Sequence, residues 1–179
     1  MVSEAGRQVM QNKTQISIRT LCILLRSDPV EQVLLGYKKA GYGVGKYTGF
    51  GGKVEPGETI GQAVARELEE ETSIQVALDD LQAVGRLNFV FPYRPEWTQE
   101  VHVFTAAHWL GEAKESREMI PQWFKLDDIP YDGMWQDGHH WLPPILAGKF
   151  VEGRFVFKTD NESLSEVEIK GYSVPGENN

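Results

Sequence analysis

The chain has 179 residues, enough for one domain with a full hydrophobic core, and its 41% hydrophobic and 25% charged residues are ordinary for a globular protein. The formal net charge of −8 argues against a surface that binds polynucleotides, because phosphate backbones are held by basic patches. The single cysteine, Cys22, excludes a disulfide framework and a metal site built from thiolates.

The two ends of the chain differ in composition from its middle. Residues 1–13 hold charged side chains and no apolar stretch long enough for a signal peptide or membrane anchor, so we expect a disordered extension. Residues 14–170 are expected to form one domain, and residues 171–179 a flexible tail. We therefore expect a cytoplasmic protein that does not bind membranes.

The first predicted strand, residues 15–25, alternates at its start and then becomes continuously apolar, which is typical of a strand covered on both faces. A turn at Asp28 and Pro29 leads to a second short strand over 33–35. The remaining predicted elements outside the 38–72 segment are strands over 83–91, 100–108 and 123–126, an irregular helix over 139–146, and a hairpin of strands 155–157 and 164–169.

Residues 38–53 form a loop with four lysines, six glycines and no acidic residue. Its backbone amides and ammonium groups are suited to contact a polyphosphate. The glycine spacing matches neither a P-loop nor a dinucleotide-binding turn. The loop alone is weak evidence, and its meaning depends on the segment that follows.

That segment predicts a helix over residues 60–72, with Thr59 and Gln62 as a capping box. Glu67, Glu70 and Glu71 fall within an arc of about 100° near its C-terminal end. Like charges there repel each other and the helix dipole, so the arrangement favours a bound cation. Oxygen ligands alone indicate Mg²⁺ or Mn²⁺. The alternative is a solvated acidic surface.

Two further side-chain patterns, one on this helix and one on a predicted strand, can be explained by structure as well as by function. Arg66 can pair with Glu70 one turn later, which would hold a ligand carboxylate in place. Leu87, Phe89 and Phe91 share one face of a predicted strand, and this pattern fits either plain core or a wall on which a base stacks.

The loop and helix together resemble the Nudix box. The matching positions are Gly52, Glu58, Arg66, Glu67, Leu68, Glu70, Glu71 and Ile74. Ser73 departs from the family, which has glycine there to close the helix in a left-handed turn. We expect a perturbed cap, at a cost of about 1 kcal/mol, and intact chemistry.

Beyond the box, the order of segments over about residues 14–158 resembles the MutT-related oxidised purine nucleoside triphosphate diphosphatases. The resemblance implies an α/β fold, the Nudix α/β/α sandwich around a mixed β-sheet. It also implies hydrolysis of damaged purine (deoxy)nucleoside triphosphates, such as 8-oxo-dGTP or 2-hydroxy-dATP, to monophosphate and pyrophosphate. The partner would be a small-molecule nucleotide, and the protein a monomer.

The resemblance also implies roles for individual residues. Glu67, Glu70, Glu71 and Arg66 would serve catalysis, and the metal would be held by Gly51, Glu67, Glu70, Glu71 and Glu118. The substrate would contact Thr20, Lys38, Thr48, Phe50, Lys53, Phe89, Phe91, Trp135 and Asp137. Thr48 stands where the family usually has asparagine, and Gly138 where it has a second aspartate, so the identity of the base stays open.

Two other functions remain open at this point. One is hydrolysis of another nucleoside diphosphate derivative, such as ADP-ribose. The other is a non-catalytic Nudix-fold nucleotide sensor. Such sensors typically lose one or more helix carboxylates, whereas this chain retains all three.

Overall fold

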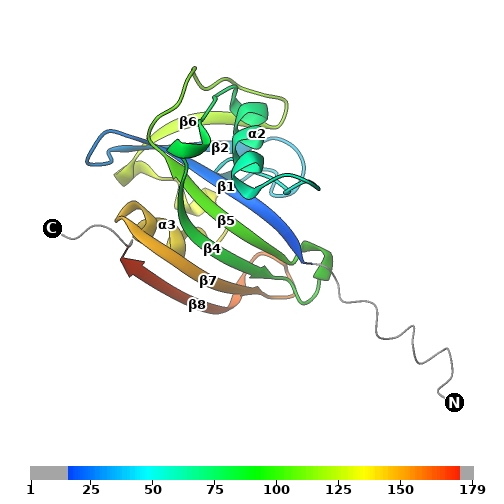
Figure 1. The fold of residues 1–179 in the computed structure, drawn as a ribbon. Helices are drawn as coiled ribbons and strands as arrows, with labels where there is room; N and C mark the ends of the chain where they lie inside the picture. Colours follow the sequence, from blue (N-terminus) through cyan, green and yellow to red (C-terminus); the bar gives the residue numbers. More distant parts are fainter. Residues whose placement is uncertain (1–15, 174–179) are drawn as a thin grey trace, which may run out of the picture.

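The computed structural model describes residues 16–173, which form a mixed eight-stranded sheet with two α-helices packed on it (Figure 1). The strands are β1 (Ser17–Arg26), β2 (Gln32–Lys38), β3 (Tyr47–Thr48), β4 (Gln82–Val90), β5 (Gln99–Ala106), β6 (Met119–Lys125), β7 (Lys149–Phe157) and β8 (Leu164–Ser173). The helices are α2 (Ile60–Thr72) and α3 (Gly138–Leu146). Short 3-10 turns lie at Leu78–Asp80, Pro95–Trp97, Leu126–Asp128 and Tyr131–Gly133.

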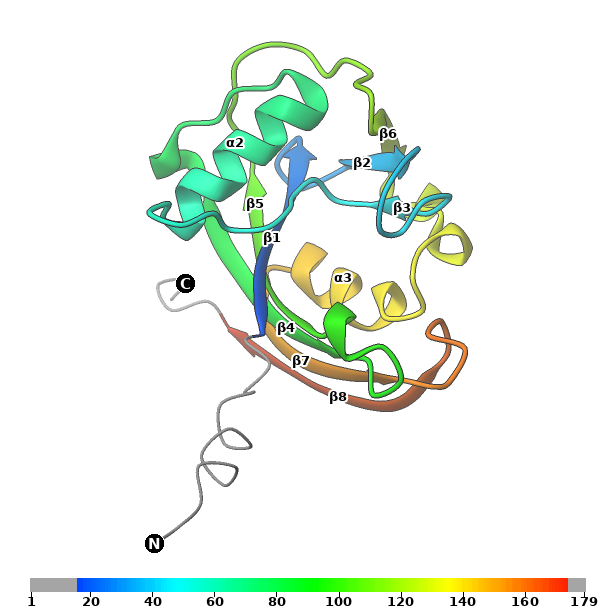
Figure 2. The same cartoon turned by 90° about the vertical axis from the view of Figure 1, so that its right-hand side faces the viewer.

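The strand order is β3-β2-β1-β5-β4-β7-β8. Strand β6 pairs with the edge of β2 that lies opposite β1 and β3. The pairs β1 with β5 and β4 with β7 are parallel, whereas the remaining pairs are antiparallel. The predicted mixed sheet is therefore confirmed. Figure 2 shows the sheet curving around α3, with α2 on the opposite side of β1 and β5.

Each face of the sheet has its own hydrophobic core. Cys22 and Leu24 of β1 pack with Val64 and Leu68 of α2, whereas Ile23 joins the cluster under α3. Successive residues of a strand point to opposite faces, so a strand between two helical layers must be apolar at every position. This explains the continuous apolar run in β1 and confirms the α/β sandwich.

The structure changes the predicted C-terminal boundary. Strand β8 continues to Ser173 and pairs with β7 from Lys149 onward, so residues 171–173 belong to the sheet and the predicted tail begins too early. Residues 1–13 and 174–179, predicted as an extension and a tail, lie outside the described residues. Between residues 16 and 173, no helix is long and apolar enough to cross a membrane.

Candidate active site

Helix α2 begins and ends at the predicted residues. Thr59 accepts a hydrogen bond from the backbone N–H of Gln62 at 3.2 Å, and the Gln62 side chain accepts from the Thr59 N–H at 2.8 Å. Ser73 closes the helix with φ at 67°, and its N–H donates to the Glu69 carbonyl. Serine therefore adopts the left-handed conformation that the family assigns to glycine, and the helix closes normally.

Arg66 connects α2 to the loop before it. Its guanidinium donates two hydrogen bonds to Glu58, at 2.7 and 3.0 Å, and one to the Lys53 carbonyl at 3.1 Å. The contact to Glu70, the only partner predicted, is longer at 3.4 Å, while Glu67 lies at 2.9 Å. The prediction was therefore incomplete: Glu58 is the principal partner. The hydrogen bond from Arg66 lowers the pKa of the Glu58 carboxyl.

Glu71 is the buried member of the three helix carboxylates, with 4% of its side chain exposed. It accepts a hydrogen bond from the Gly51 N–H at 3.0 Å and lies 3.5 Å from the Lys38 ammonium. Burial raises the pKa of Glu71 to about 7, although Lys38 and the Gly51 N–H oppose that rise. Lys38 also lies 3.5 Å from Glu118, so one ammonium bridges two carboxylates from distant parts of the chain.

The carboxylates are arranged as two pairs, each bridged by a cation. Arg66 holds Glu67 and Glu70, and Lys38 holds Glu71 and Glu118. Within residues 16–173, no three His, Cys, Asp or Glu side chains converge as a ready metal cluster. A divalent ion held between Glu71 and Glu118 would take the place of the Lys38 ammonium, whereas Arg66 contacts only one oxygen of Glu67.

The backbone beside the carboxylates fits this requirement. A side chain at Gly52 would place its Cβ 2.2 Å from a Glu67 carboxylate oxygen, so only glycine leaves room for that carboxylate. The adjacent Gly51 N–H holds Glu71. Two carboxylates from successive turns of α2 thus flank one glycine segment, and their oxygen donors suit a hard divalent ion.

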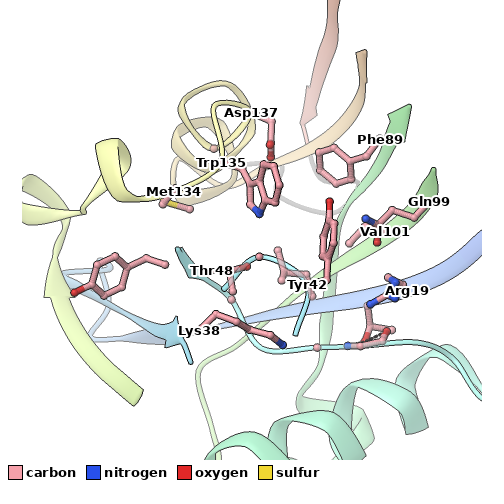
Figure 3. Close-up of a pocket in the computed structure, with 18 of the residues that line it drawn as sticks. Arg19, Lys38, Tyr42, Thr48, Phe89, Gln99, Val101, Met134, Trp135 and Asp137 are labelled. Atoms are coloured by element: carbon pink, nitrogen blue, oxygen red, sulfur yellow. Dashed lines mark hydrogen bonds between the residues drawn. The ribbon is translucent and has the colours of Figure 1, made fainter. Parts of the chain in front are cut away.

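A cavity of about 320 Å³ extends from this glycine segment across the sheet to α3 (Figure 3). The predicted residues in its lining are Thr20, Lys38, Thr48, Gly51, Phe89, Glu118, Trp135 and Asp137. Figure 3 shows Lys38 at the end next to α2, and Trp135 and Asp137 at the other end. The cavity therefore joins the carboxylate helix to an aromatic pocket.

Three predicted substrate contacts lie elsewhere. Phe50 is fully buried in the core under α2, because its backbone pairs with Cys22 and turns its ring away from the cavity. Lys53 is exposed and contributes its carbonyl to Arg66. Phe91 is buried and stacks on Phe157, with ring centroids 4.2 Å apart. None of the three lines the cavity, so the structure does not bring them together with the other predicted substrate contacts.

The aromatic face of β4 is divided between the core and the cavity. Leu87 and Phe91 are core. Phe89 stacks on Phe155 with centroids 5.5 Å apart and also lines the cavity. Strand β4 ends at Val90, so Phe91 leaves the sheet and packs behind the pocket.

Asp137 is 5% exposed and accepts a hydrogen bond from the Trp141 indole N–H at 2.7 Å. Burial raises the pKa of Asp137 to about 6, while Trp141 and the Lys46 charge oppose that rise. Lys46 lies 4.9 Å above the Trp135 ring. The pocket thus contains one buried carboxyl that is easily protonated, beside an electron-rich aromatic wall.

Sequence reasoning missed four polar residues of the lining, Arg19, Tyr42, Tyr47 and Gln99. Tyr42 stacks on Trp135 with ring centroids 5.5 Å apart. Gln99 lies one residue before the predicted strand over 100–108, so the sequence did not mark it as part of the sheet. Arg19 carried a usable signal, since it interrupts the apolar pattern of β1.

The fold, the carboxylate helix and the adjoining pocket define a hydrolase of the Nudix class. The NUDIX domain model matches residues 17–144, and the chain belongs to that family. Hydrolases of this family generally need divalent metal ions, and a small-molecule nucleotide substrate is consistent with the relatives.

Individual relatives share most of the chain. The oxidized purine nucleoside triphosphate hydrolase of Mus musculus is 44% identical, over 82% of this chain and 90% of its own. The protein of the same name from Danio rerio is 46% identical, over 76% and 88%. The crystal structure of a MutT protein from Bacillus halodurans superposes with a TM-score of 0.71 at 27% identity, covering 86% of this chain and 97% of its own.

Proposed function

We propose that this protein hydrolyses oxidised purine (deoxy)nucleoside triphosphates to the monophosphate and pyrophosphate, which removes damaged nucleotides from the pool. The main support is one continuous cavity that reaches from Gly51 and Lys38 to Trp135 and Asp137. A nucleotide needs such a path, because its base and its phosphates require opposite environments. The mouse and zebrafish relatives that share most of the chain bear this activity in their names.

We propose Mg²⁺ as the metal, with Mn²⁺ as a substitute. The residues that would hold it are Gly51, through its carbonyl, with Glu67, Glu70, Glu71 and Glu118. When bound, the divalent ion neutralises phosphate charge and lowers the pKa of an attacking water. The support is the oxygen-only donor set around a glycine segment that tolerates no side chain.

The chain's own side chains then perform binding and proton transfer. Lys38, between Glu71 and Glu118, is positioned to meet a phosphate oxygen once a metal takes over its carboxylate partners. One helix carboxylate accepts the proton of the attacking water. Arg66 is a positioning residue, since it fixes Glu67 against the loop through Glu58.

The base end of the site differs from the family pattern at two positions. Asp137 is the one cavity carboxyl at that end within the described residues, because Gly138 supplies no second acid. Thr48 offers one hydroxyl donor in place of an amide. We therefore expect a preference for oxidised purines that is narrower or weaker than in relatives with asparagine and two acids.

The test is pyrophosphate release, measured as kcat/KM for 8-oxo-dGTP, 2-hydroxy-dATP, the four normal dNTPs and ADP-ribose. We expect 8-oxo-dGTP to exceed dGTP by at least about tenfold. Equal values for the two would remove the proposed function, and ADP-ribose as the best substrate would replace it. Glu70→Gln serves as the inactive control, because the Glu70 side chain is exposed and does not pack in the core.

Absence of turnover on every nucleotide, with nucleotide binding retained, would identify a sensor. The monomeric state and the cytoplasmic location remain predictions from the sequence, and size-exclusion chromatography with light scattering tests the first of them.

A further inference from the structure

Gln99 places an amide on the floor of the cavity. It begins β5 and pairs laterally with Phe89 of β4 and with Ser17 of β1. Only 7% of Gln99 is exposed, yet it lines the cavity. Figure 3 shows it entering from the sheet beside Val101 and Tyr42, whereas Asp137 enters from the segment before α3.

The Ser17 hydroxyl, on the neighbouring strand, is buried without a hydrogen-bond partner among residues 16–173. The Tyr42 hydroxyl lies beside the Gln99 amide. Burial raises the pKa of Tyr42 and the Asp137 charge raises it further, while Arg19 and the Gln99 amide lower it. The amide and the hydroxyl are thus neighbours in the cavity wall, and an amide that meets this hydroxyl still has a donor or an acceptor for a ligand.

An amide in such a place is suited to contact a ligand. Buried polar groups are normally satisfied by protein, water or ligand. The Gln99 amide opens into the cavity where the nucleotide is proposed to bind. A ligand with matching groups would hydrogen-bond the part of the amide that Tyr42 does not engage.

The hydrogen-bonding groups of an amide determine which edge of a purine base it pairs with. Glutamine offers a donor and an acceptor side by side, and pairs best with an edge that carries an acceptor beside a donor. The five-membered-ring edge of guanine presents two acceptors, N7 and O6, so only one of them can be met. Oxidation to 8-oxoguanine places a hydrogen on N7 between two carbonyl oxygens, which matches the amide.

We propose that Gln99 is a specificity-determining residue of this site, whose amide pairs with the five-membered-ring edge of an oxidised guanine. The inference rests on the proposed function and adds that Asp137 takes the Watson–Crick edge, which leaves the other edge of the base facing the sheet. Adenine also carries a donor beside an acceptor on this edge. Gln99 therefore separates oxidised from normal guanine, and does not separate guanine from adenine.

The test measures binding of the product analogues 8-oxo-dGMP and dGMP by isothermal titration calorimetry, so the readout does not depend on turnover. Gln99→Met removes the amide at nearly constant volume. We expect it to weaken 8-oxo-dGMP binding by about ten- to hundredfold and to leave dGMP binding within about twofold. Gln122→Met, at an exposed position on β6, is the matched control and should change neither affinity.

The outcomes separate this inference from the proposed function. A wild-type protein that binds both monophosphates equally overturns the proposed function and the inference with it. A wild type that discriminates, with the same ratio in Gln99→Met or equal losses for both ligands, overturns the inference alone. If Gln99→Met does not fold, Gln99→Asn, which withdraws the amide by one methylene, must show the same selective loss.

Discussion

The buried carboxyl of Asp137 makes the stability of this protein depend on pH in a defined direction. Burial raises its pKa from 3.8 to about 6. Folding therefore favours the protonated form. The resulting stabilisation is fully present below about pH 4 and is lost as the pH rises through about 6.

The magnitude follows from the difference between the two pKa values, which is about two. Each pKa step corresponds to about 1.36 kcal/mol, so the full effect is about 3 kcal/mol. Asp137→Asn removes the titration and keeps an oxygen that can accept the Trp141 N–H. The variant should exceed the wild type by about 1 kcal/mol near pH 4.5, where part of the stabilisation is already lost, and by about 3 kcal/mol at pH 8.

The assay is urea unfolding of wild type and variant between pH 4.5 and 8, in EDTA to exclude metal linkage. All other titrating groups are shared by the two proteins, so they cancel in the difference. Asp127→Asn, at an exposed position in the turn after β6, should give a difference that does not change with pH. A flat difference for Asp137→Asn, or a wild type more stable at pH 8, would refute the reasoning.

Three further predictions concern the helix and its metal. Chelation with EDTA should abolish turnover and added Mg²⁺ or Mn²⁺ restore it, and full activity in excess chelator would contradict the metal assignment. Gly52→Ala should lower kcat by about a hundredfold by displacing Glu67, while Gly61→Ala, whose added Cβ meets nothing closer than 3.8 Å, should not. Ser73→Gly should raise the free energy of unfolding by about 1 kcal/mol, because glycine adopts φ at 67° without strain; no gain in urea titration would argue otherwise.

Much of this protein is determined by local patterns. The bounds of α2, its capping box and the left-handed Ser73 follow from residues within one or two turns of each other, so sequence spacing suffices to predict them. The continuous apolar run of β1 likewise reports a sheet covered on both faces. The carboxylates of α2 fall on one side of the helix wherever that helix packs.

The tertiary structure decided which side chains reach the cavity. Phe89 lines it and Phe91 does not, because β4 ends between them. The principal partner of Arg66 is Glu58, eight residues away across a loop whose path no helical periodicity encodes. Gln99 becomes a cavity residue only through the register of β5 with its two neighbours. Strand register and loop path depend on contacts between distant parts of the chain, so the chemistry of the base pocket could be read only after the sheet was assembled.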